Sequence, residues 1–135
     1  MSNIHTPTDQ VLSKCIDIGV FATQPSQGID TRGFTRAKFI IAANTAASST
    51  LDASLAESSD DGVNVPFATI AGSAISTIVS SSTRSVRVIS VNLDNRERYL
   101  RVQEVVTGTV TGYIGVELYN ADEMPVVQDF PPTVL

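Results

Sequence analysis

Side chains that branch at Cβ dominate this sequence and restrict the structures that it can adopt. The chain contains 16 Val, 11 Ile and 14 Thr, together 41 of its 135 residues. Branched side chains are stiff about χ1 and fit a pleated sheet better than a helix. A further 15 Ser and 8 Gly lie mostly between the branched runs, where turns are expected. The sequence therefore predicts an all-β chain.

Apolar and polar residues alternate along most of the chain, as expected for strands with one buried face. In the first of these segments we expect Leu12, Ile16 and Ile18 on one face and Cys15 and Asp17 on the other. The same pattern predicts strands over residues 10–22, 34–44, 51–57, 63–71, 75–79, 83–93, 99–107 and 113–119. This number and spacing of strands is typical of an antiparallel β-sandwich. A jelly roll is the expected form because it hides most strand edges.

Two connections are predicted to be hairpins. Asp61-Gly62 is a strong hairpin signal and is expected to join residues 51–57 to a return strand over 63–71. Pro66 places that return strand at an edge or a bulge, because proline cannot donate a ladder hydrogen bond. The stretch over residues 98–119 is expected to form one long hairpin.

The two ends of the chain lack strand alternation. Residues 1–9 and 120–135 contain prolines and are expected to be extended arms on either side of one folded domain over 10–119. The first residues have neither the basic start nor the apolar run of a signal peptide, and no stretch approaches the ~20 apolar residues that cross a bilayer. We expect a protein made in the cytosol, with no membrane partner.

The charge balance and the scarcity of reactive side chains argue against several functions. With 14 Asp and Glu against 9 Lys and Arg, the net charge is −5, whereas nucleic-acid binders normally carry a basic surface. The one His, His5, lies in the N-terminal arm with no carboxylate at a motif spacing, and Cys15 is expected to pack as a small apolar residue. The sequence predicts no catalytic site, no metal site and no cofactor.

The acidic segment around Asp60, Asp61 and Gly62 has two interpretations. Together with Glu57 and Asn64 it offers the oxygen ligands that Ca²⁺ prefers. A hairpin turn needs the same residue types for backbone reasons, and the spacing lacks the ligand ladder of a calcium-binding loop. We interpret the segment as a turn.

Arginines are concentrated in one part of the chain. Five of the seven lie between residues 84 and 101: Arg84, Arg87, Arg96, Arg98 and Arg101. They could be a solvated strand face with its turn residues. Alternatively, they could form a basic stripe that docks on an acidic partner through bidentate contacts.

Both arms are too apolar for inert tails. Such segments can order on a partner by laying extended backbone and apolar anchors across it. The alternative is that the C-terminal arm folds back over its own sandwich. The candidate partner-binding residues are therefore Ile4, Pro7, Arg84, Arg87, Arg96, Arg98, Arg101, Met124, Pro125, Val127, Phe130 and Pro131.

Four segments resemble the small β-sandwich virion proteins of tailed bacteriophages. They are residues 51–62 (LDASLAESSDDG), 66–70 (PFATI), 98–102 (RYLRV) and 106–109 (VTGT), and the resemblance spans roughly residues 10–120. Proteins of this type are head decoration, or cement, proteins that clamp neighbouring capsomers from outside the shell. The resemblance implies a jelly roll or related sandwich, no enzyme activity and no cofactor. It also implies a homo-oligomer, dimer or trimer, at a symmetry axis of the outer capsid surface, in contact with the major capsid protein.

The leading hypothesis is thus a structural virion protein that stabilises a capsid by bridging its subunits. A second hypothesis is a carbohydrate-binding or adaptor β-sandwich of the phage neck, tail or fibre. Glycan sites commonly use an exposed aromatic platform, for which the chain offers Tyr99, Tyr113 and Tyr119 but no Trp. An enzyme would need a convergent polar cluster that the sequence does not show.

Overall fold

The computed structural model describes residues 11–79 and 85–119, and every regular element within these ranges is a strand. The arms expected over residues 1–9 and 120–135 lie outside them, as does Arg84. The strands are β1 (Leu12–Val20), β2 (Gln24–Pro25), β3 (Ile29–Asp30), β4 (Arg36–Thr45), β5 (Thr50–Ser58), β6 (Ala68–Thr69), β7 (Ile78–Val79), β8 (Ser85–Asn92), β9 (Tyr99–Thr107) and β10 (Val110–Tyr119).

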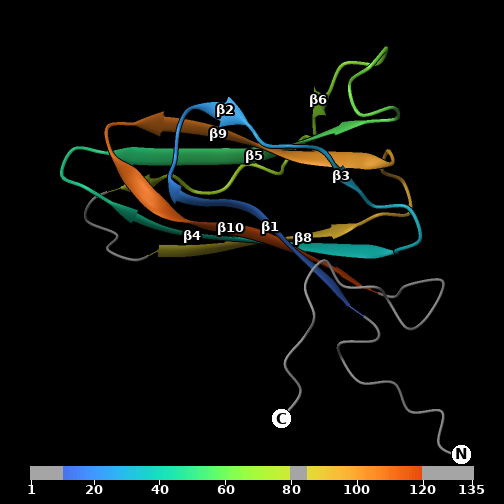
Figure 1. The fold of residues 1–135 in the computed structure, drawn as a ribbon, viewed down its shortest axis with the longest axis horizontal. Helices are drawn as coiled ribbons and strands as arrows, with labels where there is room; N and C mark the ends of the chain where they lie inside the picture. Colours follow the sequence, from blue (N-terminus) through green and yellow to red (C-terminus); the bar gives the residue numbers. More distant parts are fainter. Residues whose placement is uncertain (1–10, 80–84, 120–135) are drawn as a thin grey trace, which may run out of the picture.

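Two antiparallel sheets pack face to face (Figure 1). The first sheet has the order β1-β10-β4-β8. In the second sheet β9 pairs with β2, β3 and β5, and β5 also pairs with β6 and β7. The chain therefore pairs with itself as one long hairpin: β1 with β10, β2 and β3 with β9, β4 with β8, and β5 with β6 and β7. This hairpin is wound up so that β10 meets β4 and β9 meets β5, which is the topology of a jelly roll. The predicted all-β sandwich is confirmed.

The core lies between the two sheets. It is built from the alternate residues of the long strands, and its largest fully buried side chains include Phe39, Ile41, Leu55, Leu100 and Ile114. Burying one such side chain contributes about 1.5–3 kcal/mol. Because several long strands contribute alternate residues to this core, their strand phase is strongly fixed.

The predicted hairpin over residues 98–119 is wrong, because β9 belongs to the second sheet and β10 to the first. The connecting turn has Gly108 at φ +75°. It is bound to the neighbouring β4–β5 connection: the Thr109 N–H donates to Ser49 Oγ at 2.9 Å, and the Ala46 N–H donates to the Thr109 carbonyl at 3.1 Å. These bonds join the β9–β10 connection to the β4–β5 connection. Both connections cross from one sheet to the other.

The Asp-Gly signal does mark a reversal, at the middle of the long hairpin between β5 and β6. Asp61 and Gly62 both have positive φ, +60° and +78°. The return strand is much shorter than expected, because residues 59–67 form a loop that projects from the sandwich and only Ala68 and Thr69 pair with β5 (Figure 1).

The first strand contains an irregularity that changes which side chains are buried. Its pairing with β10 shifts between Cys15 and Asp17, so Ile16 forms a β-bulge with no paired residue on β10. An extra residue reverses the alternation beyond it. Ile18, expected to share a buried face with Leu12 and Ile16, is therefore 70 % exposed, whereas Asp17 turns toward the interior.

Candidate interaction surface

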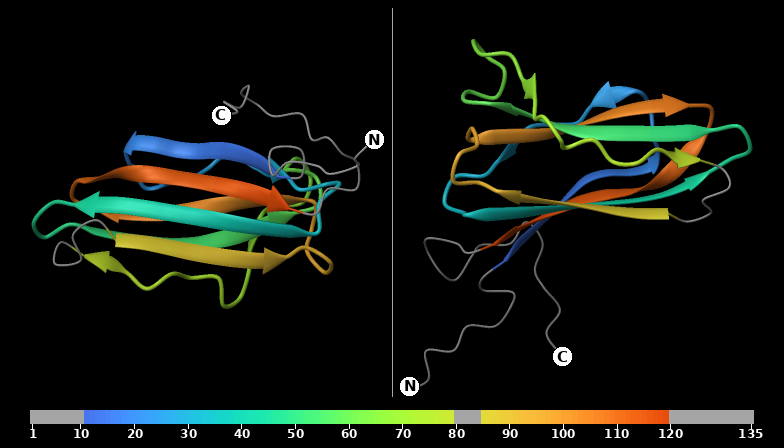
Figure 2. Two further views of the ribbon diagram at one scale, coloured as in Figure 1. Left: turned by 90° about the horizontal axis from the view of Figure 1, so that it is seen from below. Right: turned by 180° about the vertical axis from the view of Figure 1, so that it is seen from behind.

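The left view of Figure 2 looks onto the strands of the first sheet from its outer side. This outer face carries a contiguous set of apolar side chains. Two rows of paired residues cross all four strands, and the exposed Cys15 is the β1 member of the second row. We call the apolar side chains of these rows, together with Val20, the apolar face. Its members are Ile18, Val20, Ile40, Ala42, Val86, Val88 and Tyr113.

Several of these side chains are largely exposed although they sit on regular strands. Val20 is 72 % exposed, Val86 55 %, Val88 52 % and Tyr113 39 %. Single exposed apolar residues are ordinary, but a contiguous group across a whole sheet marks a contact surface.

Gly115 shapes the centre of the apolar face. A Cβ atom at this position would meet the ring and the hydroxyl of Tyr113, so the tyrosine lies over the glycine along β10. Partial burial of the hydroxyl, with Cys15 and Glu117 nearby, raises the pKa of Tyr113. The aromatic ring therefore lies flat against the sheet, so Tyr113 projects little from this part of the surface.

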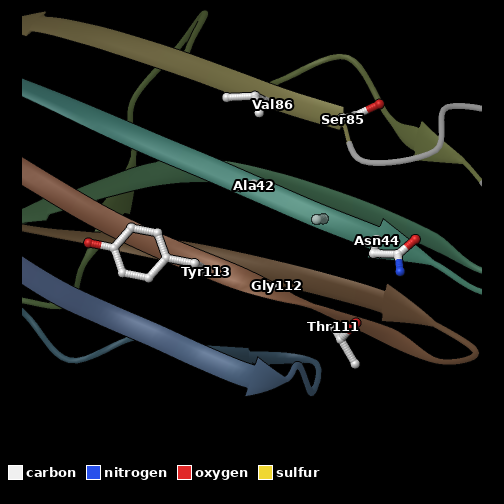
Figure 3. Close-up of a pocket in the computed structure, with 8 residues that line it drawn as sticks. Ala42, Asn44, Ser85, Val86, Thr111, Gly112 and Tyr113 are labelled. Atoms are coloured by element: carbon white, nitrogen blue, oxygen red, sulfur yellow. The ribbon is translucent and has the colours of Figure 1, made fainter.

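A shallow depression of about 280 Å³ adjoins Tyr113 at one end of the apolar face (Figure 3). Ala42, Gly112 and Val86 form much of its lining, and Asn44 and Thr111 stand at its polar end. A Cβ at Gly112 would collide with the Ala42 carbonyl oxygen, so glycine is required for the close approach of β10 to β4. The lining suits an apolar side chain better than a polar substrate.

Polar side chains flank the apolar face at both ends. Thr111 pairs with Asn44 at one end, and Glu117 pairs with Lys38 at the other. The Tyr119 hydroxyl donates a hydrogen bond to Glu117, and this bond is the main cause that raises the pKa of Tyr119 to about 12. An apolar centre with a polar rim is the usual anatomy of a protein–protein interface.

Two of the predicted partner-binding arginines form ion pairs within the chain. Arg98 donates to both carboxylate oxygens of Asp30, at 2.9 and 2.8 Å, and this hydrogen bonding lowers the pKa of Asp30. Arg96 lies 3.5 Å from the Glu57 carboxylate. These contacts tie the β8–β9 connection to the second sheet.

The other two predicted partner-binding arginines that the structure describes are Arg87 and Arg101, and they point in different directions. Arg87 is one of the alternate residues of β8 on the side of the core, and its Nε donates to Ser76 Oγ at 2.9 Å. Arg101 lies on the outer face of the second sheet with its guanidinium 4.2 Å from the centre of the Phe67 ring. Arg87, Arg96, Arg98 and Arg101 therefore do not form the continuous basic stripe that their spacing suggested, because they belong to different faces and have partners of their own.

The loop over residues 59–67 holds its acidic residues by backbone contacts. The Asp60 carboxylate accepts from the N–H groups of Asn64, at 2.7 Å, and Val65, at 3.1 Å. This arrangement favours the turn interpretation over the calcium one. In the part of the chain that the structure describes, no group of three or more His, Cys, Asp or Glu side chains could hold a metal ion.

Three further sequence expectations concern Cys15, the two ends of the chain and membrane spanning. Cys15 does not pack as expected: it is exposed, because it precedes the irregularity in β1 and faces outward. His5 and the apolar residues of both arms lie outside the described residues. Residues 11–79 and 85–119 contain no helix long and apolar enough to cross a membrane.

The apolar face itself was missed by the sequence reasoning, although a signal for it exists. The segments that became β4 and β8 carry apolar residues on both faces: Ile40 beside Ile41, and Val88 beside Ile89. A strand that covers the core with one face has no need of isoleucine or valine on the other. Such a strand indicates that both faces are covered.

Comparison with known proteins gives a likeness of fold. No protein-family model and no curated protein matches the sequence. Among solved structures, the crystal structure of the SPBc2 prophage-derived protein YomS superposes with a TM-score of 0.51 and 12 % sequence identity, over 87 % of this chain and 100 % of that one. The chain is thus similar in fold to a β-rich protein of prophage origin.

Proposed function

We propose that this protein is a structural, non-catalytic virion protein that decorates a bacteriophage capsid and stabilises it by clamping neighbouring major capsid subunits. The observation that carries the proposal is the apolar face, a contiguous exposed surface on a sheet whose other side forms the core. A surface of this kind is costly to leave in water and favours association with protein.

Two further observations support a place in a phage particle. Jelly rolls recur in viral capsid proteins and in lectins. YomS, which shares the fold, is prophage-derived, and segments such as residues 98–102 resemble those of phage head decoration proteins. We place the protein on the outer capsid surface, with the two apolar arms reaching over capsid subunits.

The proposed mechanism depends on rigidity and repetition. A sandwich transmits strain with little bending, because its two sheets are held by a packed core. Many copies on one shell multiply modest contacts, since each further contact between linked subunits forms at a high effective concentration. The protein would then resist separation of capsomers without any chemical step.

Carbohydrate binding on a neck, tail or fibre is the second candidate. Tyr113 favours it, because an aromatic ring beside a depression is a common platform for a sugar. The depression is lined mainly by Ala, Gly and Val, which offer few of the hydrogen bonds that sugar hydroxyls require. A glycan array with specific hits that Tyr113→Ala abolishes would favour this candidate.

Rebinding to empty heads tests the proposed function. The full-length chain should co-sediment with empty heads of the phage that encodes it and should raise the temperature at which they burst. A chain lacking residues 120–135 should lose head binding while its far-UV circular dichroism stays that of a folded sandwich. Val105→Asp, on the outer face of the second sheet, should still bind. Full-length protein that does not bind heads would contradict the proposal, and binding without residues 120–135 would contradict the role of the arm.

A further inference from the structure

We infer that the apolar face is the contact between two copies of this chain, packed sheet against sheet about a two-fold axis. The inference builds on the proposed function, because it names the occupant of the surface that carries it. It assigns the apolar face to a homodimer, which would clamp neighbouring capsid subunits because each of its two copies holds one of them.

The size of the first sheet matches a reversible dimer. Strands spaced about 4.8 Å apart and rising about 3.3 Å per residue give four strands of about nine residues a face of roughly 19 by 30 Å, or some 570 Å² in projection. Two such faces bury close to the ~1,200 Å² below which interfaces are weak or transient. The area is thus that of a weak, reversible dimer.

The face is also complementary to itself under a two-fold rotation. The two-fold axis lies in the plane between the two copies and runs along the strands, midway between β10 and β4. Rotation about it places β1 of one copy over β8 of the other. Ile18 of each copy then meets Val86 of the second copy, and Cys15, which shares a row with Val88, meets Val88. Apolar side chains therefore cover apolar side chains on both sides of the axis, as an isologous interface requires.

The charges on the rim permit this arrangement. The same rotation keeps each end of the sheet at its own level, so Glu117 on β10 of each copy lies over Lys38 on β4 of the other. A carboxylate of each copy then faces an ammonium group of the other, so opposite charges meet and no like charges are brought together. At the centre, Ala42 and the tyrosine lying over Gly115 keep the surface low enough for two sheets to approach to the usual ~10 Å.

Sedimentation velocity over a concentration series tests the inference on the full-length chain. The wild-type protein should change from monomer to dimer between low micromolar and several hundred micromolar concentrations. Val88→Asp would bury a carboxylate in the contact and should raise the dissociation constant by about tenfold or more. Val105→Asp is the matched control: Val105 is 53 % exposed against 52 % for Val88, and it lies on the outer face of the other sheet. It should dimerise like the wild type.

The result separates this inference from the proposed function when head binding is measured in parallel. A wild type that stays monomeric throughout, or a Val88→Asp variant that dimerises as well as Val105→Asp, would overturn the homodimer. A monomeric wild type whose Val88→Asp variant loses head binding would assign the face to the capsid protein instead. Dimers that depend on Val88 and fail to bind heads would support the homodimer and contradict the decoration role.

Discussion

Asp17 on β1 and Glu104 on β9 bring two carboxyl groups together between the sheets, close enough to share a proton. Glu104 is 2 % exposed, and neither of its oxygens accepts a hydrogen bond from a donor of the described residues. Two carboxylates can bond to each other only through a shared proton. Burial is the main cause that raises the pKa of Glu104 to about 8, and Asp17 raises it further. Glu104 therefore holds a proton at neutral pH and donates it to Asp17.

We expect the free energy of unfolding to fall as the pH rises from about 4.5 to about 8. In this window the folded protein keeps the Glu104 proton, which the unfolded chain has already released, so each rise in pH favours unfolding. A loss of about 2–4 kcal/mol over the whole window is expected, since one pKa unit corresponds to about 1.4 kcal/mol and local relaxation reduces the full difference. Asp30 and Asp60, whose pKa values lie below 3.8, act at lower pH and in the opposite direction. Urea unfolding followed by far-UV circular dichroism at several pH values measures the slope.

Two variants identify the group responsible for that slope. Glu104→Gln keeps a hydrogen-bond donor toward Asp17 but cannot ionise, so its stability should be nearly independent of pH between 5 and 8. Glu97→Gln changes an exposed glutamate and should keep the slope of the wild type. Equal slopes in the two variants would show that Glu104 is not the titrating group.

The same Asp17 shows why local patterns predicted the fold better than the side-chain directions. Alternation identified the long strands, because several of them bury every second residue in a shared core. It could not locate the extra residue between Cys15 and Asp17, since a bulge is defined by the pairing with β10 rather than by β1 itself. The reversal moved Ile18 to the surface and a carboxylate to the interior.

Long-range pairing was equally invisible to local patterns. The turn at Gly108 resembles a hairpin turn in sequence, yet it joins strands of opposite sheets. Its neighbour Thr109 is hydrogen-bonded to Ser49 and Ala46 of the other connection between the sheets. The arginines of residues 84–101 looked like one group because they are neighbours in sequence. In the fold, Arg87 and Arg101 lie on different sheets, so only the three-dimensional arrangement decides which charges act together.

Ser58 is expected to anchor the projecting loop that follows β5. Its buried Oγ accepts from the N–H groups of Asp60, at 3.3 Å, and Gly62, at 3.0 Å, and donates to the Val65 carbonyl at 2.7 Å. Ser58→Ala leaves these groups without their partner and should lower the free energy of unfolding by about 1–3 kcal/mol. Hydrogen exchange at Gly62 and the urea midpoint should both report the loss. Ser59→Ala, at the exposed neighbouring position, should change neither, and an equal effect of the two variants would contradict the anchor.

Gly108 should tolerate alanine less well than another glycine of positive φ. A Cβ at Gly108 would meet the Ser49 hydroxyl that accepts from the Thr109 N–H, whereas Gly33, at φ +91°, has no atom within 4 Å of the same position. Gly33→Ala should cost about 1–2 kcal/mol from backbone strain alone. Gly108→Ala should cost about 1–2 kcal/mol more, because it also displaces the Ser49 bond. Thermal unfolding of both variants gives the comparison, and equal losses would mean that Ser49 moves aside without cost.

The Arg98–Asp30 pair is expected to contribute little to stability despite its two short hydrogen bonds. Both side chains are more than 40 % exposed, so water and salt screen their attraction. A double-mutant cycle with Asp30→Asn and Arg98→Gln should give only a small coupling energy at neutral pH, and a smaller one at high salt. Because the pair lowers the pKa of Asp30, the coupling should be retained at mildly acidic pH and lost as the pH falls through the folded-state pKa, which lies below 3.8. A coupling of several kcal/mol that ignores salt would show that the pair is shielded from solvent. Arg98 would then be a structural residue of the β8–β9 connection, unable to leave Asp30 for an acidic partner.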